Sequence, residues 1–194
     1  MTRPTVKAVY AELSRCLAPA LEDAGLERIR GLSYPAWAVV VEGSGFVSYS
    51  LQVDKKATDP YLGGGFRVEV EKSSRATPAL GINGQALFFQ LMTAAEIREF
   101  LHEQNRVIQS YPTPPEEQIL LYPEGPVREY YLKSFREQSA FDAIRCWLRY
   151  RSEADVRSWA QMLSPLVSSF VERAALYLDP DQCFLGKGRL LPDP

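Results

Sequence analysis

The spacing of hydrophobic residues predicts a helix at the start of the chain. Over residues 6–21, apolar side chains recur every three or four positions, which places them on one helix face. Gly25 and Leu26 follow, and this pair predicts a helix end closed by a hydrophobic contact. Pro19 lies inside the pattern and is expected to kink the helix near positions 15–16, or to divide it there.

Residues at alternate positions, cleanest over 47–54, then predict a three-strand meander. Residues 37–42 and 47–54 alternate on either side of the Gly-Ser-Gly sequence at 43–45, which is typical of a hairpin turn. A third alternating stretch covers residues 66–71, where Glu69 and Glu71 occupy the polar positions. Because charged and apolar residues alternate, we expect one face of the sheet to contact water, which favours antiparallel strands.

The second half of the chain predicts further helices and one more strand. Residues 86–92 fit either a short strand or the approach to a helix, which a capping box at 93–96 then begins. The Tyr-Pro-Thr-Pro-Pro sequence at 111–115 ends this helix, and residues 126–137 fit either a helix or a strand. Residues 144–151 alternate as a strand, and a second capping box opens a helix at Ser152. Pro165 after Ser164 indicates either a second helix or a kink.

This order of elements predicts an α+β fold. We expect helix, three-strand meander, helix, linker, strand and helix, with an antiparallel sheet of about four to five strands covered by helices. A chain of 194 residues is long enough for one domain. We therefore expect a single domain over residues 1–178, a Pro-rich linker near 111–126 and an irregular tail over 179–194.

The composition excludes several classes of protein. The chain is 46% hydrophobic and 24% charged with a net charge of −2, which argues against a nucleic-acid binder. Its longest uncharged stretch, 76–95, is too polar to span a membrane, and the start of the chain lacks the apolar core of a signal peptide, so we expect a cytoplasmic protein. Three separated cysteines and a single histidine, His102, give no zinc-binding pattern, and we expect no metal or cofactor.

The sequence offers no clear catalytic constellation. His102 is expected to be an exposed helix residue, without a nucleophile beside it. The glycines at 63–65 precede a strand, whereas phosphate-binding glycine loops precede a helix, so we interpret them as turn or loop residues. Glu69 and Glu71 are compatible with an acid–base pair or a cation site, but a solvated sheet face explains them better.

A stripe of arginines around a tryptophan is the strongest candidate for a binding site. The stripe consists of Arg145, Trp147, Arg149 and Arg151 on alternate positions of the predicted strand. It is suited to an acidic partner or ligand, with the indole as a stacking platform and with the nearby Tyr130 and Tyr131 extending the surface. Alternatively, if this strand lies beside the strand of Glu69 and Glu71, the two stripes neutralise each other.

Three segments carry a resemblance to known families. They are Leu-Glu-Arg-Ile-Arg-Gly at 26–31, Gly-Phe-Arg-Val-Glu-Val-Glu-Lys-Ser at 65–73 and Trp-Leu-Arg-Tyr-Arg-Ser-Glu-Ala-Asp-Val at 147–156. With the order of elements, they resemble small bacterial α+β domain families of unknown function, whose architecture is immunity-like or secretion-chaperone-like. The resemblance implies no catalytic residue.

Together these observations favour a non-enzymatic, protein-binding role, as an adaptor, chaperone-like or immunity-like protein. We expect a protein partner, neither nucleic acid nor membrane, and a monomer or homodimer. The alternative is a small-molecule sensor or an enzyme. Its pocket, lined by carboxylate, tyrosine and arginine side chains, would lie between the sheet and the 111–140 segment.

Overall fold

The computed structural model describes residues 4–43, 45–54, 63–75, 83–111, 138–142, 145–184 and 187–192. Its helical elements are α1 (Val6–Asp23), the 3₁₀ turn η1 (Phe88–Leu91), α2 (Ala94–Gln109), α5 (Glu153–Leu163), the 3₁₀ turn η2 (Ser164–Leu166) and α6 (Val167–Tyr177). Its strands are β1 (Glu27–Arg28), β2 (Ala36–Val41), β3 (Gly45–Val53), β4 (Gly64–Ser73), β5 (Gln85–Leu87) and β6 (Leu148–Tyr150).

The strands form one open antiparallel sheet in the order β1-β2-β3-β4-β5. Strand β4 is long enough to pair with two short strands along its second edge, with β5 opposite Glu69–Glu71 and with β6 opposite Gly64–Phe66. The predicted α+β fold with an antiparallel sheet is therefore confirmed. The described residues hold six strands rather than four or five, because the two-residue β1 is too short to show an alternating pattern.

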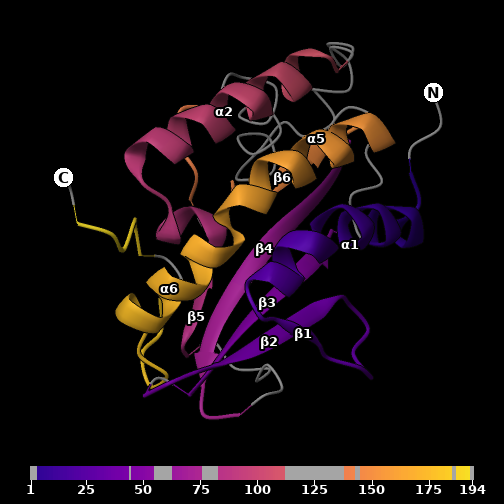
Figure 1. Ribbon diagram of the computed structural model, residues 1–194. Helices are drawn as coiled ribbons and strands as arrows, with labels where there is room; N and C mark the ends of the chain where they lie inside the picture. Colours follow the sequence, from indigo (N-terminus) through magenta and orange to yellow (C-terminus); the bar gives the residue numbers. More distant parts are fainter. Residues whose placement is uncertain are drawn as a thin grey trace, which may run out of the picture.

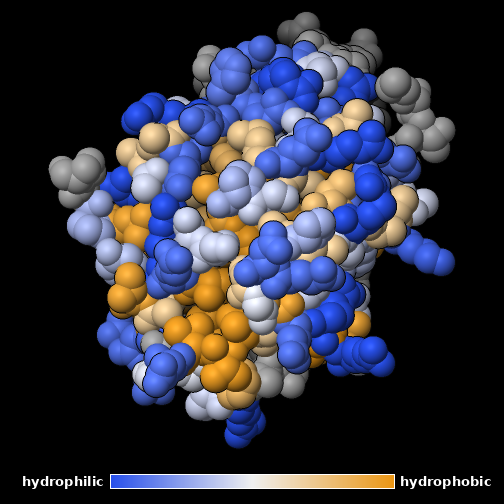
Figure 2. All heavy atoms as spheres, in the orientation of Figure 1, coloured by the Kyte–Doolittle hydropathy of each residue, from blue (hydrophilic) through white to orange (hydrophobic). Residues whose placement is uncertain are grey.

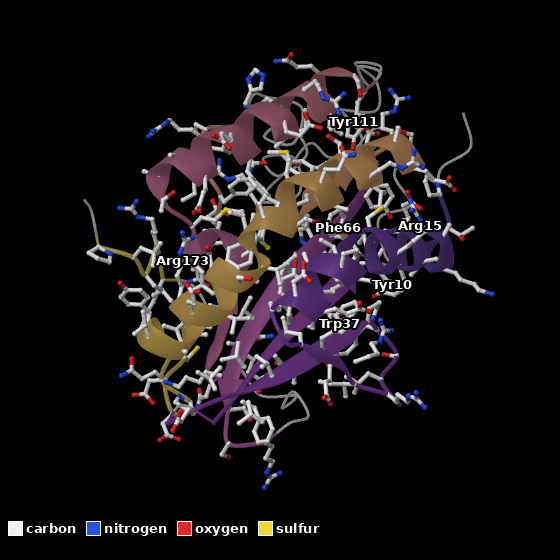
Figure 3. The ribbon with its side chains drawn as sticks, in the orientation of Figure 1. Tyr10, Arg15, Trp37, Phe66, Tyr111 and Arg173 are labelled. Atoms are coloured by element: carbon white, nitrogen blue, oxygen red, sulfur yellow. The ribbon has the colours of Figure 1, made fainter. Side chains whose placement is uncertain are left out.

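The helices cover one face of the sheet (Figure 1). Helices α1, α5 and α6 lie across this face, while α2 packs beside β6. The apolar side chains of β3 and β4 point into the resulting core, where Tyr49 stacks on Phe170 with ring centroids 6.5 Å apart. Phe66 lies in this layer behind α1 and α5 (Figure 3). Arg173 of α6 pairs with Glu96 in the first turn of α2 at 2.8 Å, which joins the two ends of the helical layer.

Local capping signals position the helices as predicted. Thr93 and Ser152 form the two capping boxes, and η2 separates α5 from α6, so the two-helix interpretation is confirmed. The end of α1 is also as predicted, because Gly25 adopts φ +72° and the Leu26 amide donates to the Leu21 carbonyl at 2.9 Å. Of the two effects expected of Pro19, a kink or a division, the division is wrong, since α1 continues through it as one helix.

The tail after α6 is irregular in its described residues but is tied to η1. The Gln90 side chain is fully buried, and its amide nitrogen donates to the carbonyl oxygens of Phe184 at 2.7 Å and Lys187 at 3.0 Å. The Leu190 amide donates to the Gln90 carbonyl at 2.8 Å. Apart from Tyr111, the predicted linker lies outside the described residues, as does the 126–137 segment.

Candidate functional site

The polar face of the sheet is buried around Glu69 and Glu71, so the expectation that these two carboxylates lie on a solvated face is wrong. Glu69 is 7% exposed and Glu71 is 3% exposed, with Ser48 and Ser50 beside them on β3. A buried carboxylate needs charged or hydrogen-bonding partners. Glu69 has both, because an Arg67 nitrogen lies 2.5 Å from one carboxylate oxygen and the Gln85 amide donates to the other at 2.7 Å.

Arg67 lies at the centre of this polar layer. Its guanidinium stacks on the Trp147 ring, 4.7 Å from the ring centroid, and contacts the Cys146 sulfur at 3.8 Å. Burial alone lowers the pKa of Arg67, but the negative charge of Glu69 and the contact with Cys146 outweigh it and raise the pKa. Arg67 and Glu69 therefore form an ion pair that lies under the Trp147 indole.

The charges of Glu69 and Glu71 also change the pKa of a nearby tyrosine hydroxyl. Burial raises the pKa of Tyr34, and the charges of Glu69 and Glu71 raise it further. The charges of both carboxylates thus reach the Tyr34 hydroxyl. Neither of the two cavities described below is lined by these residues.

The predicted arginine stripe lies beside β4, as the alternative required. Arg149 is opposite Gly65 in the β4–β6 pair and is only 8% exposed, and its backbone amide donates a hydrogen bond to the Gln104 side-chain oxygen at 2.9 Å. Trp147 is half-buried under Arg67. The ion pair with Glu69 comes from Arg67, on the same strand, and not from the stripe.

The two outer arginines of the stripe are more accessible. Arg145 pairs with Asp142 at 2.6 Å. Arg151 is exposed, donates to the Ser110 carbonyl and lies 5.4 Å from the ring centroid of Tyr111, at the end of α2 (Figure 3). Binding of a partner by this stripe stays a prediction, and Arg151 is its most exposed member.

The remaining predicted residues are placed as follows. Tyr130 and Tyr131 lie outside the described residues. His102 is exposed on α2, and Cys146 is buried in the core as expected. Gly64 and Gly65 lie in strand β4 and not in a turn or loop. A side chain at Gly64 would collide with the Tyr150 ring, so close packing against β6 explains this glycine.

Sequence reasoning missed the free edge of β2. Strand β1 pairs with β2 only at Trp37 and Ala38, so β2 continues three residues beyond its neighbour. The Val40 side chain is 67% exposed. A hollow of about 500 Å³ lies beside this edge, lined by Ile29, Ala38, Val40 and Phe46 among others. The three consecutive valines at 39–41, at the end of the hairpin, were the available signal.

The opposite side of the same edge is also apolar. Val39 and Val41 are half-buried there against the core. Figure 2 shows the helix-covered side, where hydrophilic side chains dominate over α2 at the top and apolar side chains gather in the lower half of the view. Apolar side chains thus flank the β2 edge on both faces of the sheet, in the hollow on one face and against the core on the other.

Sequence reasoning also missed a second cavity, of about 590 Å³, on the outer side of α2. Its lining includes Arg98, His102 and Arg106 at intervals of four residues, together with Gln138. The four-residue spacing of the basic residues was visible in the sequence, but the position of residue 138 against α2 was not.

Comparisons with protein families, with curated proteins and with solved structures gave no match to this chain. Among the described residues, no helix has the length and apolar character needed to cross a membrane. The residues themselves must therefore carry any functional proposal.

Proposed function

We propose that this chain is a non-enzymatic protein-binding protein, of the adaptor, chaperone-like or immunity-like kind, whose β2 edge accepts an extended apolar segment of a partner protein. The observation that carries the proposal is the free end of β2, where Val40 is 67% exposed beyond the last residue paired with β1. An exposed strand edge is a template for an added strand.

The backbone geometry supports strand addition at Val40. The Ile29 amide donates to the Ala36 carbonyl at 2.9 Å, so the backbone groups of Ala36 point toward β1. Backbone groups of an antiparallel strand alternate in direction, and those of Ala38 and Val40 therefore point to the same side. Strand β1 reaches Ala38 but not Val40, which leaves the Val40 amide and carbonyl directed toward the open edge.

The hollow supplies the side-chain specificity. Ile29, Ala38, Val40 and Phe46 make its floor apolar, while Glu27 and Arg28 of β1 lie at its margin. An added strand would place alternate side chains over the hollow, as in other cases of β-augmentation. The partner segment should therefore carry an apolar residue at that position and polar residues next to it.

Site-specific photo-crosslinking in the native host tests this proposal. A photoreactive residue replaces Val40 in one variant and Leu176 in a control, because Leu176 is 76% exposed on α6 and is not among the residues that line the hollow. We expect position 40, but not position 176, to crosslink to an apolar segment of one partner. Equal labelling at both positions, or a crosslink only to a second copy of this chain, overturns the proposal.

The alternative of a small-molecule sensor or an enzyme is supported by the burial of Glu69 and Glu71 near Tyr34. Against it, Glu69 is already bound by Arg67 and Gln85. A carboxylate bound in this way is a poor general base, because both of its oxygens already accept hydrogen bonds within the fold.

A further inference from the structure

The outer side of α2 carries a cavity that the proposed function does not use. Its volume of about 590 Å³ lies within the range of pockets that bind small molecules. The wall facing the chain's interior is formed by Asn105 and Gln138, which are 9% and 8% exposed. The cavity is distinct from the β2 edge, which lies at the opposite end of the sheet (Figure 1).

The charged residues described in the lining are all basic. Arg98, His102 and Arg106 are four residues apart, so they form one stripe along α2. Successive members are about 6 Å apart along the helix axis. A single phosphate or carboxylate group is therefore able to contact two neighbouring members at once.

Only one of the three basic residues is already neutralised. Arg106 pairs with Glu103 at 2.7 Å and with Asp155 at 3.3 Å, and hydrogen bonding from Arg106 lowers the pKa of Glu103. In the part of the chain that the structure describes, Arg98 and His102 have no ion pair or hydrogen bond. By contrast, Arg67 and Arg173, in other parts of the fold, each form an ion pair with a glutamate.

The polar wall is held rigidly. The Asn105 amide nitrogen donates to the Gln138 carbonyl at 3.0 Å, and the Gln138 backbone amide donates to the Asn105 side-chain oxygen at 2.7 Å. The Gln138 side chain donates to two further carbonyls, of Ala140 and Arg145, at 3.0 Å each. A wall fixed in this way loses little entropy when a ligand binds.

We propose that this cavity binds a small molecule through an anionic head group, a phosphate or a carboxylate, held between Arg98 and His102. The charge belongs at that end because Arg106 is already paired. The other end, near Gln109 and Ser139, offers neutral hydrogen-bonding groups and suits an uncharged polar body. The Leu101 side chain supplies an apolar contact beside Arg98 and His102.

The single histidine makes the test direct, because the imidazole of His102 gives one isolated signal in a ¹H–¹³C NMR spectrum. Inorganic phosphate and acetate are titrated separately into the full chain at constant pH and constant ionic strength, with sodium chloride as the reference. We expect a saturable shift of the His102 signal in at least one titration, with an apparent Kd in the millimolar range. The titration that saturates identifies the head group as phosphate or carboxylate.

Two variants make the result specific. Arg98→Gln is expected to weaken binding at least about tenfold, since a hydrogen-bonded charge is removed from the anion. Arg30→Gln is the matched control, because Arg30 is an exposed arginine outside this cavity, and its titration should equal that of the unmodified chain. Unchanged thermal melting of both variants verifies that the fold is retained. The proposal is overturned if neither anion gives a saturable shift, or if Arg98→Gln titrates like Arg30→Gln.

Discussion

Gln104 should be one of the residues on which the stability of this fold depends most. It is 1% exposed on α2, and its amide nitrogen donates to the Trp147 carbonyl at 2.8 Å and to the Gln138 side chain at 3.2 Å. Its oxygen accepts the Arg149 amide at 2.9 Å. Because β6 pairs with β4 on its other edge, the Gln104 side chain acts in place of a further strand.

The substitution Gln104→Met removes these three hydrogen bonds while keeping an unbranched side chain of similar size. Three buried polar groups then lose a partner, and a net cost of about 1 kcal/mol for each gives a loss of about 3 kcal/mol. Little cavity is created, so the loss measures the hydrogen bonds. The control Gln109→Met changes an exposed residue on the same helix and should alter stability by less than about 0.5 kcal/mol.

Urea denaturation followed by far-ultraviolet circular dichroism measures both variants. We expect the midpoint of Gln104→Met to fall with an unchanged m-value, since the exposed area on unfolding is the same. If Gln104→Met loses less than about 1 kcal/mol, then Trp147 and Arg149 satisfy their backbone groups elsewhere, and the role given to Gln104 is refuted.

Three further substitutions test other parts of the structure. Tyr49→Phe should raise the free energy of unfolding, measured by urea denaturation, by about 1 kcal/mol, because the Tyr49 hydroxyl is buried without a hydrogen-bond partner among the described residues. A loss of stability would show that a partner exists. Gly64→Ala should cost more than about 2 kcal/mol, since the added carbon meets the Tyr150 ring, and a soluble variant with an unchanged melting temperature would contradict this packing. Hydrogen bonds from Arg15 and, with a smaller effect, from Arg157 lower the pKa of Glu12 from 4.5 to about 2. The ionised Glu12 carboxylate therefore stabilises the fold fully above pH 4.5, and this stabilisation is lost as the pH falls toward 2. Glu12→Gln should therefore flatten the melting temperature against pH in that range, and a profile parallel to that of the unmodified chain would argue against the pKa shift.

Local signals in the sequence were sufficient where the structure is determined by neighbouring residues. Thr93 and Ser152 cap helices through side-chain contacts three residues away, and Gly25 ends α1 through its own backbone conformation. The alternation over β3 and β4 predicted both strands and their antiparallel pairing. Each of these features depends on a few consecutive positions.

Features that depend on distant segments were not predictable in the same way. Alternation shows that Glu69 points away from Val68 and Val70, but not whether that second face is covered, so its burial was missed. Gln104 lies at helical spacing from Phe100 and Ile108, on the buried face of α2, but only the location of β6 gives its polar side chain hydrogen-bond partners. The cavity on α2 likewise needs Gln138 from another part of the chain.

The two edges of β4 have consequences for the order of folding. Along one edge Val53 pairs with Phe66, thirteen residues later, and along the other edge Phe66 pairs with Leu148, which follows it by 82 residues. Closing the longer loop costs more entropy and is slower, so the β3–β4 hairpin should form before β6 docks. Mutations in β6 and at Gln104 should then mainly accelerate unfolding, whereas mutations within the hairpin should slow folding. Strand β4 should therefore take part in an early step of folding, through its pairing with β3, and in a late step, through its pairing with β6.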